Sequence, residues 1–188
     1  MTSAEVLTLL EQRGALLTGH FKLSSGLHSD RFIQKFRIFE DPPTAESVCG
    51  ALAELLRSAD ASVVVSAAVG GILPGYIVAR RLGVRDIFVE KEAGTPVLRR
   101  GFSLDERDRA VIVEDVMTTG KSTSEVVEVV KQKGARISAI GTIVKRGNAT
   151  LDFPVSTLLD LPLADYQPDA CPLCRRGLPL EDPGSRRS

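Results

Sequence analysis

The sequence has few of the features that mark a secreted or membrane-spanning protein. Its 188 residues include three cysteines, two histidines and no tryptophan. Three cysteines do not build a disulfide framework, so a reducing cytoplasm is the expected compartment. No apolar run approaches the ~20 residues that cross a bilayer, and no basic segment followed by an apolar stretch opens the chain. We therefore expect a cytoplasmic protein that does not bind membranes.

A net charge is also missing, because 24 Lys and Arg residues balance 24 Asp and Glu residues. Neutralising a nucleic-acid backbone needs a clear excess of basic residues, so no nucleic-acid partner is expected. The composition, with 43% hydrophobic residues, is that of a globular protein. At this length we expect one domain over residues 1–188, with a Pro-rich C-terminal tail from about residue 168.

The first third of the chain contains two predicted helices. Thr2 and Glu5 have the spacing of a capping box before a short amphipathic segment. A second helix is expected after Asp41, with two prolines in its first turn. The region between the helices, which includes residues 21–26, is expected to be a loop.

From residue 62 onward, β-branched runs too short for helices alternate with helical patterns. Strands are expected at residues 62–66, 86–89, 110–113, 137–144 and 155–159, and helices at 71–82 and 121–133. This alternation predicts an α/β fold with a mainly parallel central sheet and helices on both faces. Ligands of such sheets bind beyond the carboxyl ends of the strands, so the segments that follow the strands are the candidates for function.

One of these segments, residues 111–123, reads VIVEDVMTTGKST. The N–H groups at the start of the following helix, together with the hydroxyls of the turn, form a donor site suited to a phosphate monoester. Glu114 and Asp115 would repel that phosphate unless they accept hydrogen bonds, for example from the vicinal hydroxyls of a sugar. A phosphorylated sugar satisfies both requirements.

Two other nucleotide-binding motifs do not fit this segment. A Walker A loop needs a glycine where the chain has Asp115, although Gly120, Lys121 and Ser122 match the end of that motif. The dinucleotide fingerprint G-x-G-x-x-G is absent from the strand-to-helix turns. The segment instead resembles the phosphoribosyl-diphosphate (PRPP) motif of type I phosphoribosyltransferases.

A second segment shows which type I phosphoribosyltransferases the chain resembles most. Residues 21–29 carry the pattern F-x-L-x-S-G-x-x-S, which is similar to the N-terminal segment of orotate phosphoribosyltransferases. The resemblance continues through SAAVGG at residues 66–71 and through Lys145-Arg146, and it covers most of the chain to about Leu163. Residues 98–102 and the Cys-Pro-Leu-Cys tail look most like the subgroup found in thermophilic and related bacteria.

The resemblance implies an enzyme that transfers the ribose 5-phosphate of PRPP to orotate. The products would be orotidine 5′-monophosphate and diphosphate, in de novo pyrimidine biosynthesis. It also implies a small hood built from the N-terminal and C-terminal segments, and a homodimer in which a loop from one subunit reaches into the neighbouring site. Mg²⁺ would accompany PRPP, held mainly by PRPP oxygens and water, so no metal ligand of the protein is named.

Site residues follow from the same resemblance. Those implied to bind PRPP are Lys91, Glu114, Asp115, Val116, Met117, Thr118, Thr119, Gly120, Lys121 and Ser122. Those of the diphosphate loop are Ala67, Ala68, Val69, Gly70 and Gly71. Those implied to bind orotate are Thr118, Arg146, Phe21, Ser25 and Gly26. Catalytic roles are implied for Glu114, Asp115, Arg99 and Arg100. Arg146 suits its role because a guanidinium fork pairs bidentately with a carboxylate.

The chain also departs from the family pattern. Many orotate enzymes carry lysines where this chain has Ser24 and Gly70, and a Lys-x-His pair in the mobile loop. The corresponding loop, roughly residues 93–108, has no histidine. We expect Arg99 and Arg100 to neutralise the leaving diphosphate instead; the alternative is a basic pair on a solvated loop.

The histidines and cysteines carry no assigned role. His20 and His28 have no second metal-type ligand nearby in sequence, so each is expected to be a surface or hydrogen-bonded structural residue. Cys171 and Cys174 form half of a zinc-site pattern without a second pair. A site shared across a dimer is one alternative, but free thiols in a poorly ordered tail are expected. Cys49 is expected to be buried.

Two alternative functions stay open. A purine or uracil phosphoribosyltransferase would share the PRPP motif but not the segment at residues 21–29. A PRPP-sensing transcriptional regulator could use the same fold as a ligand switch. Such a regulator needs an added basic element for DNA or RNA, which the chain does not show.

Overall fold

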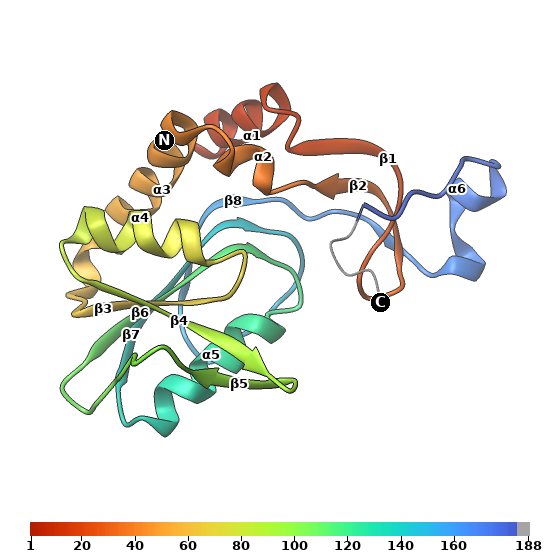
Figure 1. Ribbon diagram of the computed structural model, residues 1–188. Coiled ribbons are helices and arrows are strands. Elements are labelled where there is room, and N and C mark those ends of the chain that lie inside the picture. Colours follow the sequence, from red (N-terminus) through yellow and green to blue (C-terminus); the bar gives the residue numbers. More distant parts are fainter. Residues whose placement is uncertain (184–188) are drawn as a thin grey trace.

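A computed structural model describes residues 1–183 and contains two β-sheets (Figure 1). The larger sheet has six strands: β3 (Val63–Ala67), β4 (Arg85–Glu92), β5 (Thr95–Leu98), β6 (Arg109–Met117), β7 (Arg136–Lys145) and β8 (Val155–Asp160). Their order across the sheet is β5-β4-β3-β6-β7-β8. Neighbouring strands are parallel except that β5 runs antiparallel to β4. The predicted mainly parallel sheet is confirmed, with all five strands expected from residue 62 onward.

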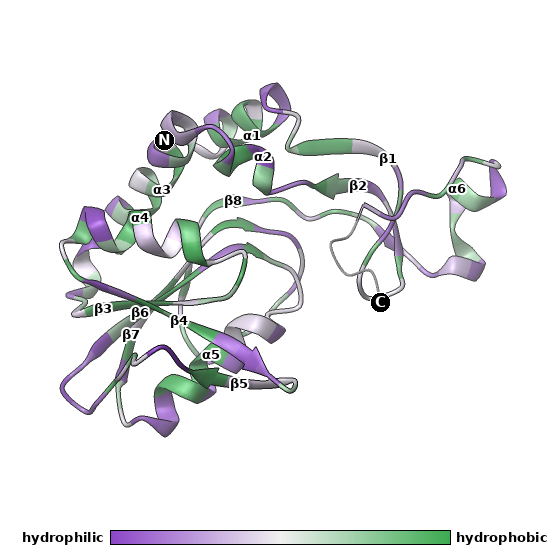
Figure 2. Ribbon diagram, in the orientation of Figure 1, coloured by the Kyte–Doolittle hydropathy of each residue, from purple (hydrophilic) through white to green (hydrophobic). Residues whose placement is uncertain are grey.

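Helices cover both faces of this sheet. One face carries α1 (Ser3–Gln12), α3 (Pro42–Leu56) and α4 (Ile72–Leu82), and the other carries α5 (Lys121–Gln132). Val64 of β3 belongs to the core under α3 and α4, whereas Val63 and Val65 belong to the core under α5. Because side chains alternate along a strand, one continuous apolar run fills both cores. Figure 2 shows the resulting hydrophobic centre of the sheet.

Local sequence signals set the helix ends. The Thr2 side chain accepts a hydrogen bond from the Glu5 backbone N–H, and the Glu5 carboxylate accepts one from the Thr2 N–H, which confirms the capping box. Asp41 caps α3 by accepting from the Thr44 N–H at 3.1 Å. Gly83 ends α4 with a φ of 74°, in the left-handed region that favours glycine.

The smaller sheet forms a hood beside the carboxyl ends of the larger one. It contains β1 (Leu16–Lys22), β2 (His28–Ile33) and β9 (Asp165–Tyr166), in that order. The loop expected between the two helices is therefore wrong at residues 16–22 and 28–33, which form β1 and β2; residues 23–27 form the turn between them. Thr18, Gly19 and His20 interrupt the apolar pattern of β1, so neither helix nor strand periodicity marks it. The short α2 (Phe36–Phe39) follows the hairpin, and the 3₁₀ turn η1 (Arg57–Ala59) follows α3.

The C-terminal segment packs onto this hood. It contains the 3₁₀ turn η2 (Pro168–Ala170) and α6 (Pro172–Arg175). Further along, Glu181 pairs with β1, where its N–H donates to the His20 carbonyl and its carbonyl accepts from the Lys22 N–H, both at 2.8 Å. The expectation of a poorly ordered tail is wrong for residues 168–183, because backbone hydrogen bonds and buried side chains hold them. The last five residues of the predicted tail lie outside the described residues.

The long loop expected at residues 93–108 is also partly ordered. Its first part is a hairpin, in which the turn at Ala93 and Gly94 connects β4 to β5. Leu104, further along, is buried in the core under α5. None of the helices in residues 1–183 combines the length and the apolar character needed to cross a bilayer.

Candidate functional site

Three neighbouring strands bring the predicted site segments to one edge of the sheet. β3, β6 and β7 are adjacent and parallel, so their carboxyl ends meet. The diphosphate loop at residues 67–71 follows β3, the Thr-Thr-Gly turn at 118–120 follows β6, and Arg146 follows β7. The backbone confirms the contact between the last two, because the Arg146 N–H donates to the Met117 carbonyl at 2.7 Å. This edge is where ligands bind in such folds.

The turn after β6 has the geometry of an anion site. Gly120 has a φ of 75°, and an added Cβ would lie 3.2 Å from the Ala149 Cβ, so the turn requires glycine. α5 starts at the next residue, with its first N–H groups at this edge. Thr118, Thr119 and Ser122 are exposed, so their hydroxyls are accessible to a ligand. The turn can therefore offer both hydroxyl and backbone donors to a phosphate.

The acidic pair lies just under this turn. Glu114 is 8% exposed and Asp115 is 2% exposed. Burial, reinforced by the neighbouring Asp115 carboxylate, raises the pKa of Glu114 to about 8. The Thr123 hydroxyl donates to Glu114 at 3.5 Å, and the Val116 N–H donates to Asp115 at 2.6 Å. At neutral pH Glu114 is thus mainly protonated, and its carboxyl group can both donate to and accept from sugar hydroxyls.

A lysine that sequence reasoning missed pairs with this acidic site. Lys35, at the start of α2, places its Nζ 2.6 Å from Oδ2 of Asp115. The same Nζ would lie 2.4 Å from a Cβ added at Gly70. Lys35 therefore fills the space beside the diphosphate loop. Nothing near Lys35 in sequence marks it as a site residue.

The diphosphate loop itself depends on two glycines. An added Cβ at Gly70 would lie 2.1 Å from Asp115 Oδ2, and one at Gly71 would lie 2.7 Å from the Ala67 carbonyl oxygen. A side chain at Gly71 would meet backbone, and one at Gly70 would force the Asp115 and Lys35 side chains to move. The Ala68–Val69 peptide bond between the flanking residues is cis, and Val69 is 73% exposed. The loop therefore presents backbone rather than side chains to the acidic pair.

Arg146 connects the edge of the sheet to the hood. Its guanidinium is 8% exposed, and Nη2 donates to the Ser29 hydroxyl at 3.0 Å and pairs with Asp165 at 2.5 Å. Among the described residues, its Nε has no hydrogen-bond partner. A buried guanidinium with an unused donor can bind a further acceptor, such as a ligand carboxylate.

The hairpin residues that are expected to contact orotate lie in the same hood but differ in solvent exposure. Ser25 and Gly26 lie in the β1–β2 turn, where Gly26 has a φ of 84°. Phe21 is 2% exposed, and its ring packs 5.8 Å from that of Phe32. Its contact with a pyrimidine stays a prediction.

Three of the other predicted cations, Lys91, Arg99 and Arg100, are already paired with carboxylates. Lys91 lies 2.8 Å from Glu125 of α5. Arg99 lies 3.3 Å from Glu92, and Arg100 lies 3.0 Å from Glu90. Both arginines follow the edge strand β5, which β4 and β3 separate from the acidic pair on β6. The structure therefore does not bring Arg99 and Arg100 to Glu114 within one chain.

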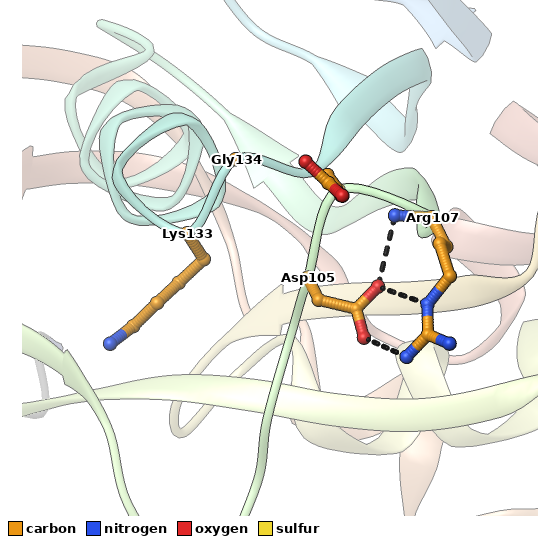
Figure 3. A pocket seen from close by; sticks show the side chains of 5 residues that line it. Asp105, Arg107, Lys133 and Gly134 are labelled. Atoms are coloured by element: carbon orange, nitrogen blue, oxygen red, sulfur yellow. Dashed lines mark hydrogen bonds and ion pairs between the residues drawn. The ribbon is translucent and has the colours of Figure 1, made fainter.

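Another surface hollow lies at the opposite edge of the sheet (Figure 3). It is formed before β6 and after α5, where Lys133 and Gly134 face residues 105–107. Asp105 and Arg107 fill part of it by pairing with each other at 2.7 Å. This hollow contains none of the predicted site residues.

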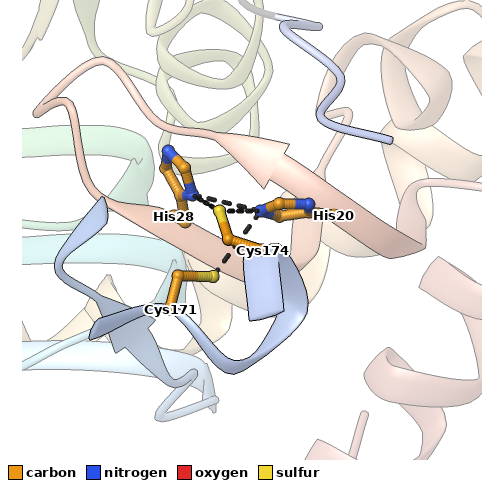
Figure 4. A group of neighbouring side chains, drawn as sticks. All are labelled: His20, His28, Cys171 and Cys174. Atoms are coloured by element: carbon orange, nitrogen blue, oxygen red, sulfur yellow. Dashed lines mark hydrogen bonds between the residues drawn. The ribbon is translucent and has the colours of Figure 1, made fainter. Parts of the chain in front are cut away.

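The histidines and the tail cysteines do come together. His20 and His28 are buried, and they meet Cys171 and Cys174 in the hood (Figure 4). The interpretation of unrelated histidines and free tail thiols missed this cluster, because the two pairs are far apart in sequence. Cys49 is buried in α3 as predicted.

The chain is similar to proteins named orotate phosphoribosyltransferase. One from Thermotoga petrophila is 47% identical over 180 residues, which are 95% of this chain and 96% of the relative. One from Chlorobaculum parvum is 42% identical over 188 residues, or 99% of this chain and 97% of the relative. No family model matches the chain.

Solved structures agree in fold. The crystal structure of orotate phosphoribosyltransferase from Aeropyrum pernix has a TM-score of 0.70 and 26% identity, over 82% of this chain and 92% of that one. The enzyme from Mycobacterium tuberculosis, with a TM-score of 0.69 and 23% identity over 84% and 95% of the two chains, supports the fold alone. With more than 40% identity over nearly the whole length of its relatives, the chain belongs to the orotate phosphoribosyltransferase family.

Proposed function

We propose that this protein transfers the ribose 5-phosphate group of PRPP to orotate in de novo pyrimidine biosynthesis. The observation that carries the proposal is the meeting of three elements at one sheet edge: the acidic pair with its Thr-Thr-Gly turn, the diphosphate loop, and Arg146 below the hood. In the reaction, a ring nitrogen of orotate loses its proton to solvent and bonds to the anomeric carbon. The bond from that carbon to diphosphate breaks, and its electron pair leaves with the diphosphate.

The 5-phosphate end of PRPP would bind at the turn after β6. The exposed hydroxyls and the first N–H groups of α5 supply donors there, and Gly120 allows close approach. Glu114 and Asp115 would then accept hydrogen bonds from the 2′ and 3′ hydroxyls. As diphosphate departs, positive charge develops on the ribose, and the negative charge of this pair lies close enough to stabilise it.

The diphosphate would bind at the loop of residues 67–71, beside Lys35. Gly70 and Gly71 leave room for anionic oxygens close to the backbone. The Lys35 ammonium, 2.6 Å from Asp115, supplies positive charge beside this loop. Lys35 would then exchange part of its contact with Asp115 for contact with the leaving group.

Orotate would bind between Arg146 and the β1–β2 turn. Its carboxylate matches the free donor of the Arg146 guanidinium. Thr118 lies one residue beyond the carbonyl that binds the Arg146 backbone, and so can contact the same ligand. Ser25 and Gly26 of the hood turn would frame the ring.

Mg²⁺ would arrive with PRPP and neutralise part of the diphosphate charge. The donors at the site fit this arrangement. The two buried carboxyl groups are hard oxygen donors that can contact hydroxyls or waters around the ion, but Asp115 is already paired with Lys35. In the described part of the chain, the group of metal-type side chains that converge is the His–Cys cluster of the hood, which contains no carboxylate.

We further propose a cytoplasmic homodimer in which the β4–β5 hairpin serves the partner's site. Several large apolar side chains are exposed in α2, the diphosphate loop and α4: Phe36, Val69, Leu73 and Tyr76. Large exposed apolar side chains that form one patch are typical of a protein interface. Arg99 and Arg100 lie away from their own acidic pair, which is consistent with a role in the site of another subunit.

Nucleotide formation with different bases tests the proposal. The purified protein is incubated with PRPP and Mg²⁺ and with orotate, uracil, hypoxanthine or adenine, and the nucleotide and diphosphate are quantified. Of the four bases, we expect only orotate to give a nucleotide. Product with a purine or uracil and none with orotate would contradict the proposed specificity, and PRPP binding without turnover of any base would support a PRPP-sensing role instead.

A further inference from the structure

Four side chains of the kinds that bind zinc converge in the hood, away from the PRPP motif (Figure 4). They are His20, His28, Cys171 and Cys174, and their ligand atoms all lie within 4.8 Å of one another. The first three residues are buried, with His20 at 3% and Cys171 at 1% exposure, and Cys174 lies at the surface. None of them contacts the candidate residues for PRPP or orotate in the interactions described above.

The register of the hairpin places both imidazoles on one face. His28 of β2 lies opposite Lys22 of β1, and His20 is two residues before Lys22. Since side chains two apart on a strand share a face, His20 and His28 are diagonal neighbours. His20 lies within an irregularity in the pairing, between Thr18 and Phe21, and such bulges re-aim side chains. The two rings lie 5.0 Å apart between centroids.

The C-terminal segment supplies the two thiols in the same way that zinc-binding turns do. Cys171 caps α6 and Cys174 lies three residues later, on the same side of a single helical turn. The Cys171 carbonyl accepts from the Arg175 N–H and the Cys174 carbonyl accepts from the Gly177 N–H, which closes the turn around the two sulfurs. The spacing C-x-x-C is that of one half of a structural zinc site.

A hydrogen bond outside the cluster fixes the orientation of His20. Its Nδ1 lies 2.9 Å from the Leu178 carbonyl oxygen, which can only accept, so Nδ1 carries the proton. The Nε2 atom is then an unprotonated lone-pair donor, and it points at the other three side chains. Support of a ligating histidine by a backbone carbonyl is the usual outer arrangement at zinc sites.

Four of the six separations between the ligand atoms are close to the edges of a tetrahedron around zinc. Zn–N bonds of about 2.0–2.1 Å and Zn–S bonds of about 2.3 Å imply separations of about 3.3 Å between two nitrogens and about 3.6 Å between nitrogen and sulfur. His20 Nε2 lies 3.1 Å from His28 Nδ1, 3.6 Å from Cys171 Sγ and 3.7 Å from Cys174 Sγ. Cys174 Sγ lies 3.3 Å from His28 Nδ1. Hydrogen bonds alone do not require all four atoms to face one point.

We propose that these four residues bind one structural Zn²⁺ ion. On binding, the two thiols lose their protons to solvent and form two Zn–S bonds, and the two imidazoles donate lone pairs. Two thiolates cancel the charge of the ion, which suits a site with three buried ligands. Four protein ligands leave no open position, so the ion has no catalytic role.

The ion would tie the two ends of the chain together. His20 and His28 come from the N-terminal hairpin, and the cysteines come from the segment after β9. The same hood holds Ser29 and Asp165, which contact Arg146. Zinc would therefore hold the hood over the site while taking no part in the reaction, and its binding does not depend on the proposed function.

The metal content of the untagged wild-type protein is the first test. We expect about one zinc per chain by mass spectrometry after purification under reducing conditions and dialysis. X-ray absorption at the zinc edge should give a first shell of two sulfurs and two nitrogens. Titration of the metal-free protein with Co²⁺ should give the strong visible bands of tetrahedral cobalt with a thiolate charge-transfer band. Substoichiometric zinc with no such cobalt spectrum, or a shell of oxygen and nitrogen only, would overturn the proposal.

Substitutions test whether these four residues bind the ion. In the double variant Cys171→Ser/Cys174→Ser, zinc content should fall at least tenfold, whereas the control Cys49→Ala should keep one zinc per chain. If the double variant fails to fold, Cys174→His keeps a complete ligand set, and it should retain zinc with a cobalt thiolate band reduced by about half. One zinc per chain in the double variant, or an unchanged thiolate band in Cys174→His, would assign the metal to other residues.

Discussion

The ammonium of Lys35 lies 2.6 Å from Oδ2 of Asp115, although the two residues share no sequence motif. Lys35 lies at the start of α2, after the hairpin of the smaller sheet, whereas Asp115 lies in β6 of the larger sheet. Asp115 is 2% exposed, whereas the Lys35 side chain is 33% exposed. A buried carboxylate needs a partner, because an unpaired buried charge loses its hydration without compensation. The ion pair therefore links α2 to the end of β6 and stabilises both the fold and the site.

Replacing Lys35 with methionine should destabilise the protein without substrates. The loss of the only cation paired with Asp115 in the described residues should cost about 1–3 kcal/mol, lowered from fully buried values because the lysine is partly exposed. For a chain of this size the expected fall in Tm is about 3–10 °C, measured by calorimetry at pH 7.5. The double variant Lys35→Met/Asp115→Asn should recover most of the loss, because the carboxylate is then neutral.

Lys131→Met is a matched control for this experiment. Lys131 pairs with Glu128 on the exposed surface of α5 at 3.3 Å, and such pairs contribute little. Its Tm should stay within about 1 °C of the wild type. An equal Tm for Lys35→Met and Lys131→Met would show that the buried pair adds no stability.

A methyl group at position 70 should disturb the same pair from the other side. The Cβ of Gly70→Ala would lie 2.1 Å from Asp115 Oδ2 and 2.4 Å from Lys35 Nζ, so both side chains must move. Because the pair lies beside the proposed diphosphate site, we expect the KM for PRPP to rise about tenfold, equivalent to ~1.4 kcal/mol of binding. Initial rates at saturating orotate measure this change.

Gly50→Ala provides the comparison. Gly50 lies within α3, and its added Cβ would meet the Arg81 side chain at an ordinary 3.6 Å. The substitution should leave KM unchanged and raise stability by about 0.5–1 kcal/mol, since alanine favours helix. If both alanine variants have the wild-type KM, the close approach at Gly70 does not matter for PRPP.

The extent to which the sequence predicts this site depends on how local each part is. The acidic pair and the Thr-Thr-Gly turn are contiguous, so a strand, a left-handed glycine and a helix start are visible in one stretch. The parallel sheet then follows from short apolar runs, since only strands buried on both faces are continuously apolar. Those features needed no knowledge of distant contacts.

The missed parts all depend on tertiary contacts. Lys35 reaches Asp115 from another element, and Cys171 meets His20 from 151 residues away in the chain. The hairpin that presents His20 and His28 lacks strand periodicity because Gly19 and polar residues interrupt it. No spacing rule within one segment detects ligands contributed in pairs by the two ends of a chain.

Glu114 should make the stability of the unliganded protein depend on pH. Burial raises its pKa from 4.5 to about 8, so its stabilising contribution is complete below about pH 4.5 and is lost as the pH rises through about 8. Glu114→Gln removes this loss. The Tm of the variant should therefore exceed that of the wild type by a margin that grows between pH 5 and pH 8.5.

The same variant should lose activity at pH 8, where about half of the Glu114 carboxyl groups are ionised, because the glutamine cannot carry the negative charge proposed to stabilise the ribose. Calorimetry across the pH series and steady-state rates at pH 8 give the two readouts. A margin in Tm that stays constant or shrinks as the pH rises would contradict the raised pKa of Glu114.

Asp86 offers a second carboxyl group whose burial costs stability. Its Oδ1 has no hydrogen-bond partner among the described residues, and burial raises its pKa to about 6. Its contribution is complete below about pH 4 and is lost as the pH rises through about 6. Asp86→Asn should raise the free energy of unfolding at pH 7.5 by about 1 kcal/mol, after allowance for partial exposure, and change it little at pH 4. Denaturant titrations at the two pH values measure this, and an equal gain at both would point to packing instead of charge.

Arg99 and Arg100 provide the test of shared sites. Each is paired with a carboxylate of β4, and two strands, β4 and β3, lie between β5 and β6 in the sheet order. We expect Arg99→Ala/Arg100→Ala to lower kcat at least tenfold while the Kd of orotate, measured by calorimetry, changes less than twofold. Arg107→Ala, which breaks an exposed pair with Asp105 at the opposite edge, should keep the wild-type kcat.

Mixing two inactive variants then decides between roles within one subunit and across two. If the arginines serve the partner's site, a heterodimer of Arg99→Ala/Arg100→Ala and Glu114→Gln contains one site with both an intact acidic pair and intact arginines. Refolding an equal mixture should restore about a quarter of the wild-type activity, since half of the dimers are mixed and each has one complete site. If the arginines act within their own subunit, every site in the mixture lacks one component, and activity should stay at the level of the separate variants.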